Sequence, residues 1–240
     1  HLSNTSKHVE LFKAFGALTP HYSRVALNFG EPIFLRPLLD EVAPAWEAAT
    51  EDPEVKPEWL NRAVDTLATR ILENVNRAAH VNPINLLAIS LLSTPKHAMT
   101  EADLAAQLEL CKALVAELPY SDRVTMTELS PAEIIAYGEK MGWISRIAHP
   151  LGDVLGLDDK AGVLLSYFRN NVTHLYAAAA WVACCFLNNR RMARASILRL
   201  GRLVYPFIQA ELFLPWTGEQ FIARIQQTID FFVARGLLGT

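Results

Sequence analysis

Apolar side chains recur every three or four residues through most of the chain after residue 55, which is the spacing of amphipathic helices. A shorter apolar helix is predicted over residues 84–92, after Pro83. Three further helices have capping-box signals at their starts, namely Thr100 to Asp103, Ser130 to Glu133 and Thr217 to Gln220. A helix over 61–79 is predicted from the period of Ala63, Val64, Leu67, Ile71, Leu72 and Val75. The pattern therefore predicts a mainly α fold.

Two stretches favour β structure. Residues 23–29 (SRVALNF) alternate and predict a strand that ends at Gly30. Residues 143–157 predict a β-hairpin, because His149-Pro-Leu-Gly-Asp153 is a turn-forming run. The order of helix, loop, helix and hairpin over residues 100–157 is also found in winged-helix modules. We therefore expect a helical C-terminal domain that contains a small, winged-helix-like β-hairpin.

The alanine-rich stretch 166–186 (SYFRNNVTHLYAAAAWVACCF) raises the question of a membrane span. No residue from Asn170 to Asn189 has a fixed charge. However, the apolar part, 175–187, is shorter than the roughly 20 predominantly apolar residues that a bilayer requires. The small side chains at 177–180 would allow another helix to approach closely. We predict a buried core helix rather than a membrane span.

Composition narrows the function classes. The chain has 240 residues, of which 51% are hydrophobic, and a formal net charge of −3. A nucleic-acid-binding protein usually has a basic excess, whereas the second helix of the winged-helix-like region contains Glu133, Glu139 and Lys140. We therefore expect no nucleic-acid partner. The three cysteines lack the spacing of a zinc site or a disulfide framework, so no metal site is expected.

Candidate ligand contacts occur where the polar run Arg169-Asn170-Asn171 meets the predicted alanine-rich helix. Arg169 and His174 could bind a phosphate or a carboxylate, because the free N–H groups of a helix start attract anions. Alternatively, Asn170 or Asn171 caps the helix while Arg169 pairs with a carboxylate of another domain. The sequence leaves both roles open, as a substrate contact or as a domain interface.

A second candidate is the arginine-rich stretch 190–203, which contains no acidic residue. On a helix, its arginines fall on one half and most of its apolar residues on the other. This pattern is typical of a helix that lies on anionic lipid or docks an acidic partner. The alternative is a solvated face whose arginines pair with acidic residues elsewhere on the surface. The arginines are Arg190, Arg191, Arg194, Arg199 and Arg202.

A succession of short motifs resembles one family. The predicted strand ends in FGEP (29–32). The later motifs, in this order, are PEWL (57–60), NLLAISLLST (85–94), LPYSDR (118–123), YFRNNVTHLY (167–176) and YPFIQAELFL (205–214). This succession is similar to the C-terminal region of the membrane-associated bacterial glycerol-3-phosphate 1-O-acyltransferase family. The resemblance extends from about residue 23 to the end of the sequence.

The resemblance implies transfer of an acyl chain from acyl-CoA or acyl carrier protein to glycerol 3-phosphate, without a bound cofactor. It implies that residues 1–45 end an α/β acyltransferase domain, with 23–29 as its last core strand, and that residues 55–240 form a helical C-terminal domain. The implied location is the cytoplasmic face of the bacterial inner membrane, with peripheral or monotopic attachment. The implied partners are anionic lipid, the acyl donor and the protein's own N-terminal catalytic domain. The arginines of 190–203 are then candidates for docking lipid or the acyl donor.

The family's catalytic His-x4-Asp motif is absent, because none of the 7 histidines has Asp at that distance. The nearest spacing, His149 to Asp153, better fits a turn. No catalytic residue is therefore expected in this sequence, which begins with His1 rather than Met and is expected to be part of a longer chain. Two other functions stay open: a non-enzymatic helical protein-interaction module, and a sister enzyme that acylates dihydroxyacetone phosphate.

Overall fold

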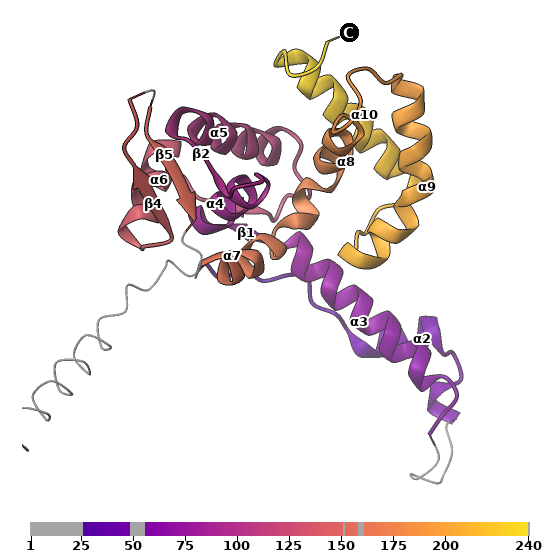
Figure 1. Ribbon diagram of the computed structural model, residues 1–240. Coiled ribbons are helices and arrows are strands. Elements are labelled where there is room, and N and C mark those ends of the chain that lie inside the picture. Colours follow the sequence, from indigo (N-terminus) through magenta and orange to yellow (C-terminus); the bar gives the residue numbers. More distant parts are fainter. Residues whose placement is uncertain (1–25, 49–55, 151, 158–160, 240) are drawn as a thin grey trace, which may run out of the picture.

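The computed structural model describes residues 26–48, 56–150, 152–157 and 161–239. It is 61% helical, which confirms the predicted mainly α fold (Figure 1). Short 3-10 helices occur at Trp46–Ala48 and Thr173–Tyr176. The α-helices are α2 (Leu35–Val42), α3 (Leu60–Arg77), α4 (Pro83–Leu92), α5 (Glu101–Glu117), α6 (Pro131–Lys140), α7 (Ala161–Asn170), α8 (Ala177–Cys185), α9 (Arg194–Leu212) and α10 (Gly218–Ala234).

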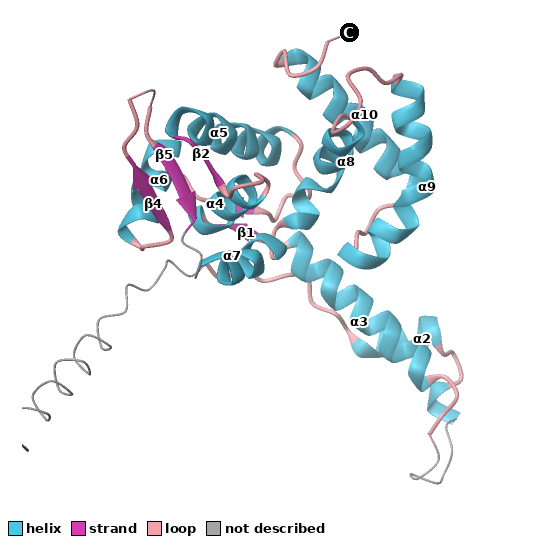
Figure 2. Cartoon of the chain, viewed as in Figure 1, coloured by secondary structure: helices cyan, strands magenta, loops and turns pink. Residues whose placement is uncertain are grey.

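A small sheet and the helices around it form one unit of the fold. Strands β4 (Ile144–Ile147) and β5 (Val154–Leu157) make the predicted hairpin, and β2 (Ala98–Thr100) pairs antiparallel with β5. Figure 2 shows this sheet beside α5 and α6. The order α4, β2, α5, α6, β4, β5 matches the winged-helix-like prediction. A further pair, β1 (His80–Val81) and β3 (Thr125–Met126), is parallel. Strands of two or three residues show too little alternation to be predicted from sequence.

Side-chain caps fix the starts of the helices. The predicted capping boxes are confirmed at α6 (Ser130, Glu133) and α10 (Thr217, Gln220). At α5, the Thr100 hydroxyl oxygen accepts a hydrogen bond from the Asp103 N–H. The hydroxyl group donates to the Asp103 carboxylate, so this cap is one-sided. The local sequence signal therefore placed these three helix starts correctly.

Helices α8, α9 and α10 pack together in a second unit. Gly201 of α9 is buried at their contact, where a Cβ atom would lie 2.6 Å from Ile225 Cδ1 of α10. The same Cβ atom would lie 3.1 Å from Trp181 Nε1 of α8. The Trp181 ring is held there, because Nε1 donates to Ile197 O at 3.3 Å. The missing side chain at Gly201 therefore lets the three helices approach closely.

Replacing Gly201 with Val is expected to lower the free energy of unfolding by about 2 kcal/mol, because the added atoms overlap Ile225 and Trp181. Ala195→Val is the matched control. Ala195 is exposed on the same helix, so its replacement costs only helix propensity, about 0.7 kcal/mol or less. Urea unfolding followed by circular dichroism measures both variants. Equal losses would contradict the close approach of the three helices.

Helices α2 and α3 form a two-helix arm that projects from the rest of the described chain (Figure 1). Arg70 of α3 binds both carboxylate oxygens of Glu41 of α2 at 2.7 Å. At the base of the arm, Asn76 Nδ2 donates to Leu212 O at the end of α9, at 2.8 Å. The buried residues between the two helices are Leu38, Leu39 and Ala63.

The strand predicted at 23–29 is not confirmed. Residues 23–25 lie outside the described part, and residues 26–29 pair with no strand of the described part. Alternation alone does not make a strand, which needs a neighbour to bind its backbone. Instead, the Asn28 side chain donates to Ala78 O and Thr125 Oγ1. The predicted domain boundary falls mainly at 49–55, which also lies outside the described residues.

The alanine-rich stretch contributes α8, a helix of 9 residues that packs on α9 and α10. Ala177, Val182 and Cys185 are buried, whereas Ala180 and Cys184 are exposed. One face of α8 therefore belongs to the core, and the other face is exposed. Among the described helices, none combines the length and the apolar character that crossing a bilayer requires.

Candidate functional site

The polar run Arg169-Asn170-Asn171 lies at the end of a helix rather than at its start. Helix α7 ends at Asn170, and α8 begins only at Ala177. The Val172 N–H and the Thr173 hydroxyl both donate to Arg169 O, which closes the turn after α7. The predicted cap of the alanine-rich helix by Asn170 or Asn171 is therefore wrong.

His174 is a buried connection between two segments. Its side chain is 4% exposed, and Nε2 lies 3.0 Å from Asn76 O at the end of α3. The ring packs edge-on against Tyr120, with centroids 5.0 Å apart. Burial lowers the pKa of His174 to about 4, so the ring is neutral at pH 7 and Nε2–H donates to the carbonyl. This geometry fits a structural connection, because a buried neutral imidazole cannot pair with a phosphate in solvent.

Asn170 and Asn171 line a groove of about 720 Å³ between the end of α7, helix α3 and residues 26–33. We call it the arm groove. Arg169 does not line it; its Nη2 donates to Asn170 Oδ1 at 3.1 Å. Among the lining residues, the single side chain with a fixed charge is Glu31. A phosphate site needs positive charge, so the arm groove fits a polypeptide better than an anionic substrate.

His80 is a further polar residue of the arm groove. Its Nδ1 lies 2.7 Å from Thr125 Oγ1. Partial burial lowers the pKa of His80 below its ordinary value. His80 therefore adds a neutral polar group to the groove at pH 7, like the neighbouring asparagines.

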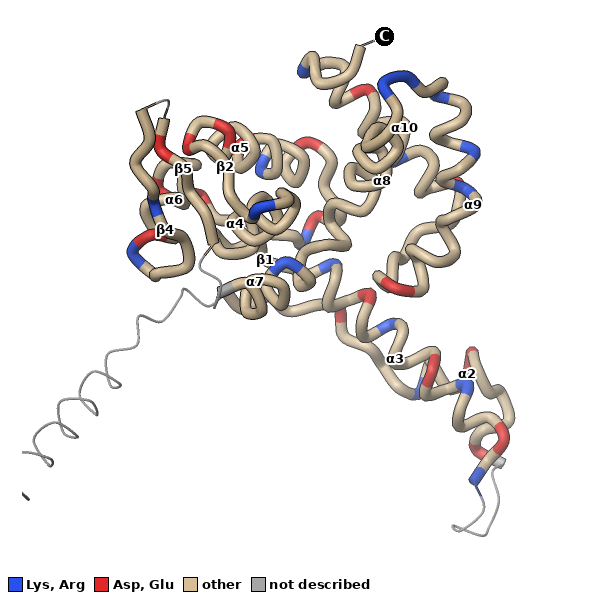
Figure 3. Tube along the Cα trace, viewed as in Figure 1, with Lys and Arg blue, Asp and Glu red and all other residues tan. Residues whose placement is uncertain are grey.

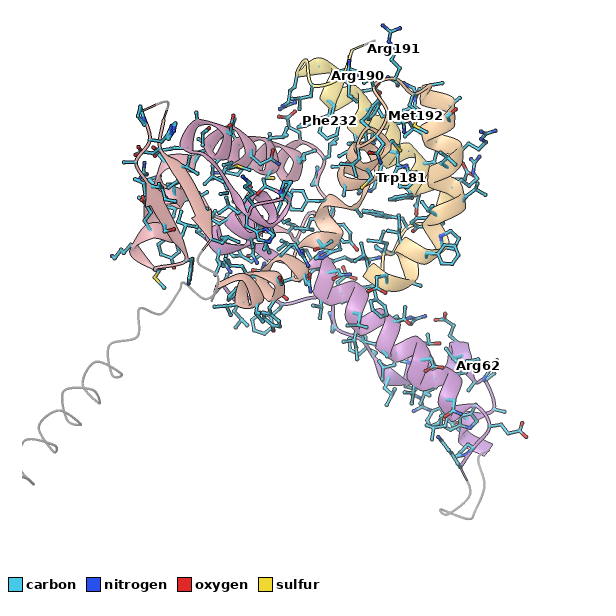
Figure 4. The ribbon with its side chains drawn as sticks, viewed as in Figure 1. Arg62, Trp181, Arg190, Arg191, Met192 and Phe232 are labelled. Atoms are coloured by element: carbon cyan, nitrogen blue, oxygen red, sulfur yellow. The ribbon has the colours of Figure 1, made fainter. Side chains whose placement is uncertain are left out.

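The structure divides the five candidate arginines. Figure 3 shows basic residues on the α8–α9 loop and along α9. Arg190 and Arg191 lie in this loop (Figure 4), and Arg194 is the first residue of α9. The predicted single helix over 190–203 is therefore wrong at its start. The chain must reverse between α8 and α9, and the helical period of the sequence does not reveal that break.

Two of these arginines pair with acidic residues of α10. Arg194 Nη1 lies 2.7 Å from Asp230 Oδ1. Arg202 Nη2 donates to both carboxylate oxygens of Glu219, at 2.9 and 3.0 Å. The alternative of a paired, solvated face thus holds for these two. Of the five candidates, the three that form no ion pair within the described part of the chain are Arg190, Arg191 and Arg199.

Arg190, Arg191 and Arg194 line a cavity of about 1110 Å³ between the α8–α9 loop and the end of α10. We call it the arginine cavity. Its other walls are mainly apolar. A basic rim beside an apolar wall fits a ligand with an anionic head and a hydrocarbon chain. The apolar side chains are Phe186, Met192, Ile197, Ile229, Val233, Leu237 and Leu238.

The near-match His149 to Asp153 is a turn. The Gly152 N–H donates to His149 O at 2.9 Å. Asp153 accepts a hydrogen bond from Arg146 Nη1, also at 2.9 Å. Among the residues that the structure describes, no cluster of His, Cys, Asp and Glu could hold a metal ion.

Sequence reasoning missed the outward face of α3. Val64, Ile71, Leu72 and Val75 have the spacing of core positions, yet they are 53%, 45%, 38% and 62% exposed. The sequence signal that could have revealed these exposed positions is the width of the arc that apolar side chains occupy around α3. At about 100° per residue, apolar side chains cover about half of this helix. The single neighbouring helix α2 covers only part of so wide an arc.

Comparison with known proteins identifies relatives along nearly the whole chain. A glycerol-3-phosphate acyltransferase of Xanthomonas campestris pv. campestris is 61% identical over 221 residues, which are 92% of this chain and 25% of the relative. One of Xylella fastidiosa is 58% identical, over 92% of this chain and 26% of the relative. One of Pseudomonas fluorescens is 40% identical, over 95% of this chain and 28% of the relative. The chain thus spans about a quarter of the length of these curated relatives.

The family model that matches describes the glycerol-3-phosphate acyltransferase C-terminal region, and it covers residues 8–240. This match includes the motifs on which the resemblance was based, from FGEP (29–32) to YPFIQAELFL (205–214). Because the family model spans far more than half of the chain, the chain belongs to the family of glycerol-3-phosphate acyltransferase C-terminal regions.

Proposed function

We propose that the chain is part of a glycerol-3-phosphate 1-O-acyltransferase that uses acyl-CoA or acyl carrier protein as donor and forms lysophosphatidic acid for phospholipid synthesis. The observation that carries this proposal is the family match over residues 8–240, together with 61% identity to a relative of that name. The sequence contains no His-x4-Asp motif. Its role is therefore to brace and dock, while the catalytic residues lie in the protein's own N-terminal domain. No bound cofactor takes part.

Acyl transfer by the purified full-length protein tests this function. Release of CoA from acyl-CoA that depends on glycerol 3-phosphate is the expected result, with acyl carrier protein as the second donor. Release that depends on dihydroxyacetone phosphate instead would assign the sister activity. If neither donor is consumed with either acceptor, the chain is a non-enzymatic interaction module and the proposal fails.

We also infer that the full-length protein binds the cytoplasmic face of the bacterial inner membrane, peripherally or monotopically. The arginine cavity supports this inference. Arg190 and Arg191 are exposed at its rim, where they could bind lipid phosphates while acyl chains contact the apolar wall. The phosphates of acyl-CoA or the acidic surface of acyl carrier protein would fit the same rim.

Reversal of both rim charges is expected to weaken binding of the full-length protein to anionic vesicles at least tenfold. Each basic residue near such a surface contributes about 1 kcal/mol, and the variant Arg190→Glu with Arg191→Glu removes two. The matched control is Lys96→Glu with Lys140→Glu, which makes the same change in net charge at two exposed lysines elsewhere. Sedimentation with vesicles of phosphatidylglycerol and phosphatidylcholine measures binding. Equal weakening by both pairs would exclude a specific role of the arginine cavity.

A further inference from the structure

Helix α3 has two apolar faces, and α2 covers only one of them. On the uncovered face, Val64, Ile71 and Val75 are 53%, 45% and 62% exposed. With the exposed Ala68, they fall within roughly 60° of one another at about 100° per residue. They therefore form one continuous strip along α3. We call Val64, Ala68, Ile71 and Val75 the outer stripe.

The outer stripe continues into the arm groove at the base of the arm. Ile71 and Val75 line this groove together with Leu27, which is 77% exposed. Asn170 and Asn171 border it at the end of α7. The result is a single apolar surface edged by neutral amides, which extends from the middle of α3 to the polar run after α7.

Such a surface is unfavourable in water. A contiguous exposed apolar patch marks an interaction site in soluble proteins. The arm has a small core, in which Leu38, Leu39 and Ala63 are buried and five further apolar side chains are partly buried. Short helices depend on tertiary packing of their apolar faces. A further contact along the outer stripe would therefore stabilise the arm.

We propose that the outer stripe and the arm groove dock the polypeptide that precedes residue 26 in the full-length protein. The matching family is a C-terminal region, and this chain covers only 25% of the Xanthomonas relative, so most of such a relative lies upstream. The described chain also enters along the groove, because residues 26–33 form part of its wall. A tethered upstream segment has a high effective concentration at this surface.

The charge of the surface favours protein over membrane. A helix that binds anionic lipid has basic residues beside its apolar face. At about 100° per residue, the three arginines of α3 all fall away from the outer stripe. The one side chain of fixed charge that lines the arm groove is Glu31. Only the identity of the upstream part as a catalytic domain rests on the proposed function; the docking surface itself does not.

Cysteine protection in the full-length protein tests the burial of this surface. Val75→Cys is matched by Leu203→Cys on α9, because Val75 and Leu203 are 62% and 66% exposed here. We expect maleimide to label position 75 at least tenfold more slowly than position 203. Mass spectrometry of the labelled peptides measures each of these two positions separately from Cys184, which is also exposed. Equal labelling rates at the two positions would overturn the proposal.

Photo-crosslinking identifies the occupant. A photoreactive amino acid at position 71 of the full-length protein is expected to cross-link to residues upstream of residue 26 in the same polypeptide. Cross-links to lipid, to a second copy, or only within residues 26–240 count against the proposal. Neither readout depends on activity. A protein that shows these cross-links but does not acylate glycerol 3-phosphate would contradict the proposed function alone.

Discussion

Replacement of Asn85 with Ala is expected to lower the free energy of unfolding by about 3 kcal/mol, because two backbone groups lose their partner. Asn85 is 2% exposed and connects two helix ends. Its Oδ1 accepts from the Asn82 N–H at the start of α4, at 2.7 Å. Its Nδ2 donates to Phe168 O near the end of α7, also at 2.7 Å. Each group left unsatisfied costs about 1–3 kcal/mol.

Asn61→Ala is the matched control for this prediction. Asn61 is exposed near the start of α3, so its replacement with a better helix former is expected to change stability by about 0.7 kcal/mol or less. Urea unfolding of both variants provides the comparison. A loss for Asn85→Ala no larger than that for Asn61→Ala would show that α4 and α7 do not depend on this side chain.

Acidification from pH 7 to pH 4 is expected to remove about 3 kcal/mol of stability through His174. Its pKa is about 4 in the folded chain, against an ordinary value of 6.5, because burial disfavours the charged ring. The unfolded chain takes up a proton as the pH falls through 6.5, whereas the folded chain does so only near pH 4. The stabilisation is therefore complete above pH 6.5 and is lost progressively between pH 6.5 and pH 4.

The variant His174→Gln measures this contribution, because Gln does not titrate and still offers an N–H group to Asn76 O. Its stability is expected to fall by about 3 kcal/mol less than that of the wild type between pH 7 and pH 4. Hydrogen bonds lower the pKa values of Glu101 and Glu133, and both carboxylates act equally in wild type and variant. The pKa of His80 is also lowered. The control variant His80→Gln therefore measures how much of the pH dependence comes from His80. Parallel pH profiles for wild type and His174→Gln would refute the assignment.

The elements that the sequence predicted correctly are those fixed by local signals. Ser130 and Glu133 sit three residues apart and cap α6 without help from any other segment. The turn between His149 and Gly152 is equally local. By contrast, the strand expected at 23–29 depends on a neighbouring strand, and its described part has none. Alternation in the sequence cannot show whether such a neighbour is present.

The candidate site was predicted less well, because its contacts join distant residues. His174 lies 98 positions from Asn76, and only the folded chain shows that the two bind each other. The arginines of 190–203 keep a helical period through the loop, so the period did not reveal that Arg190 and Arg191 precede α9. The pairing of Arg202 with Glu219 likewise depends on how α9 packs against α10.

The hydrogen bonds of Asn76 determine how a mechanical load on the arm would reach the rest of the molecule. Asn76 O binds His174, and Asn76 Nδ2 binds Leu212 O, so a single residue at the end of α3 is fastened to two other segments. Helix α3 has 18 residues and extends about 27 Å from this point at 1.5 Å per residue. A sideways load at its tip would strain both bonds at once. A displacement of the arm would therefore be passed on to α9 and to the segment that contains His174.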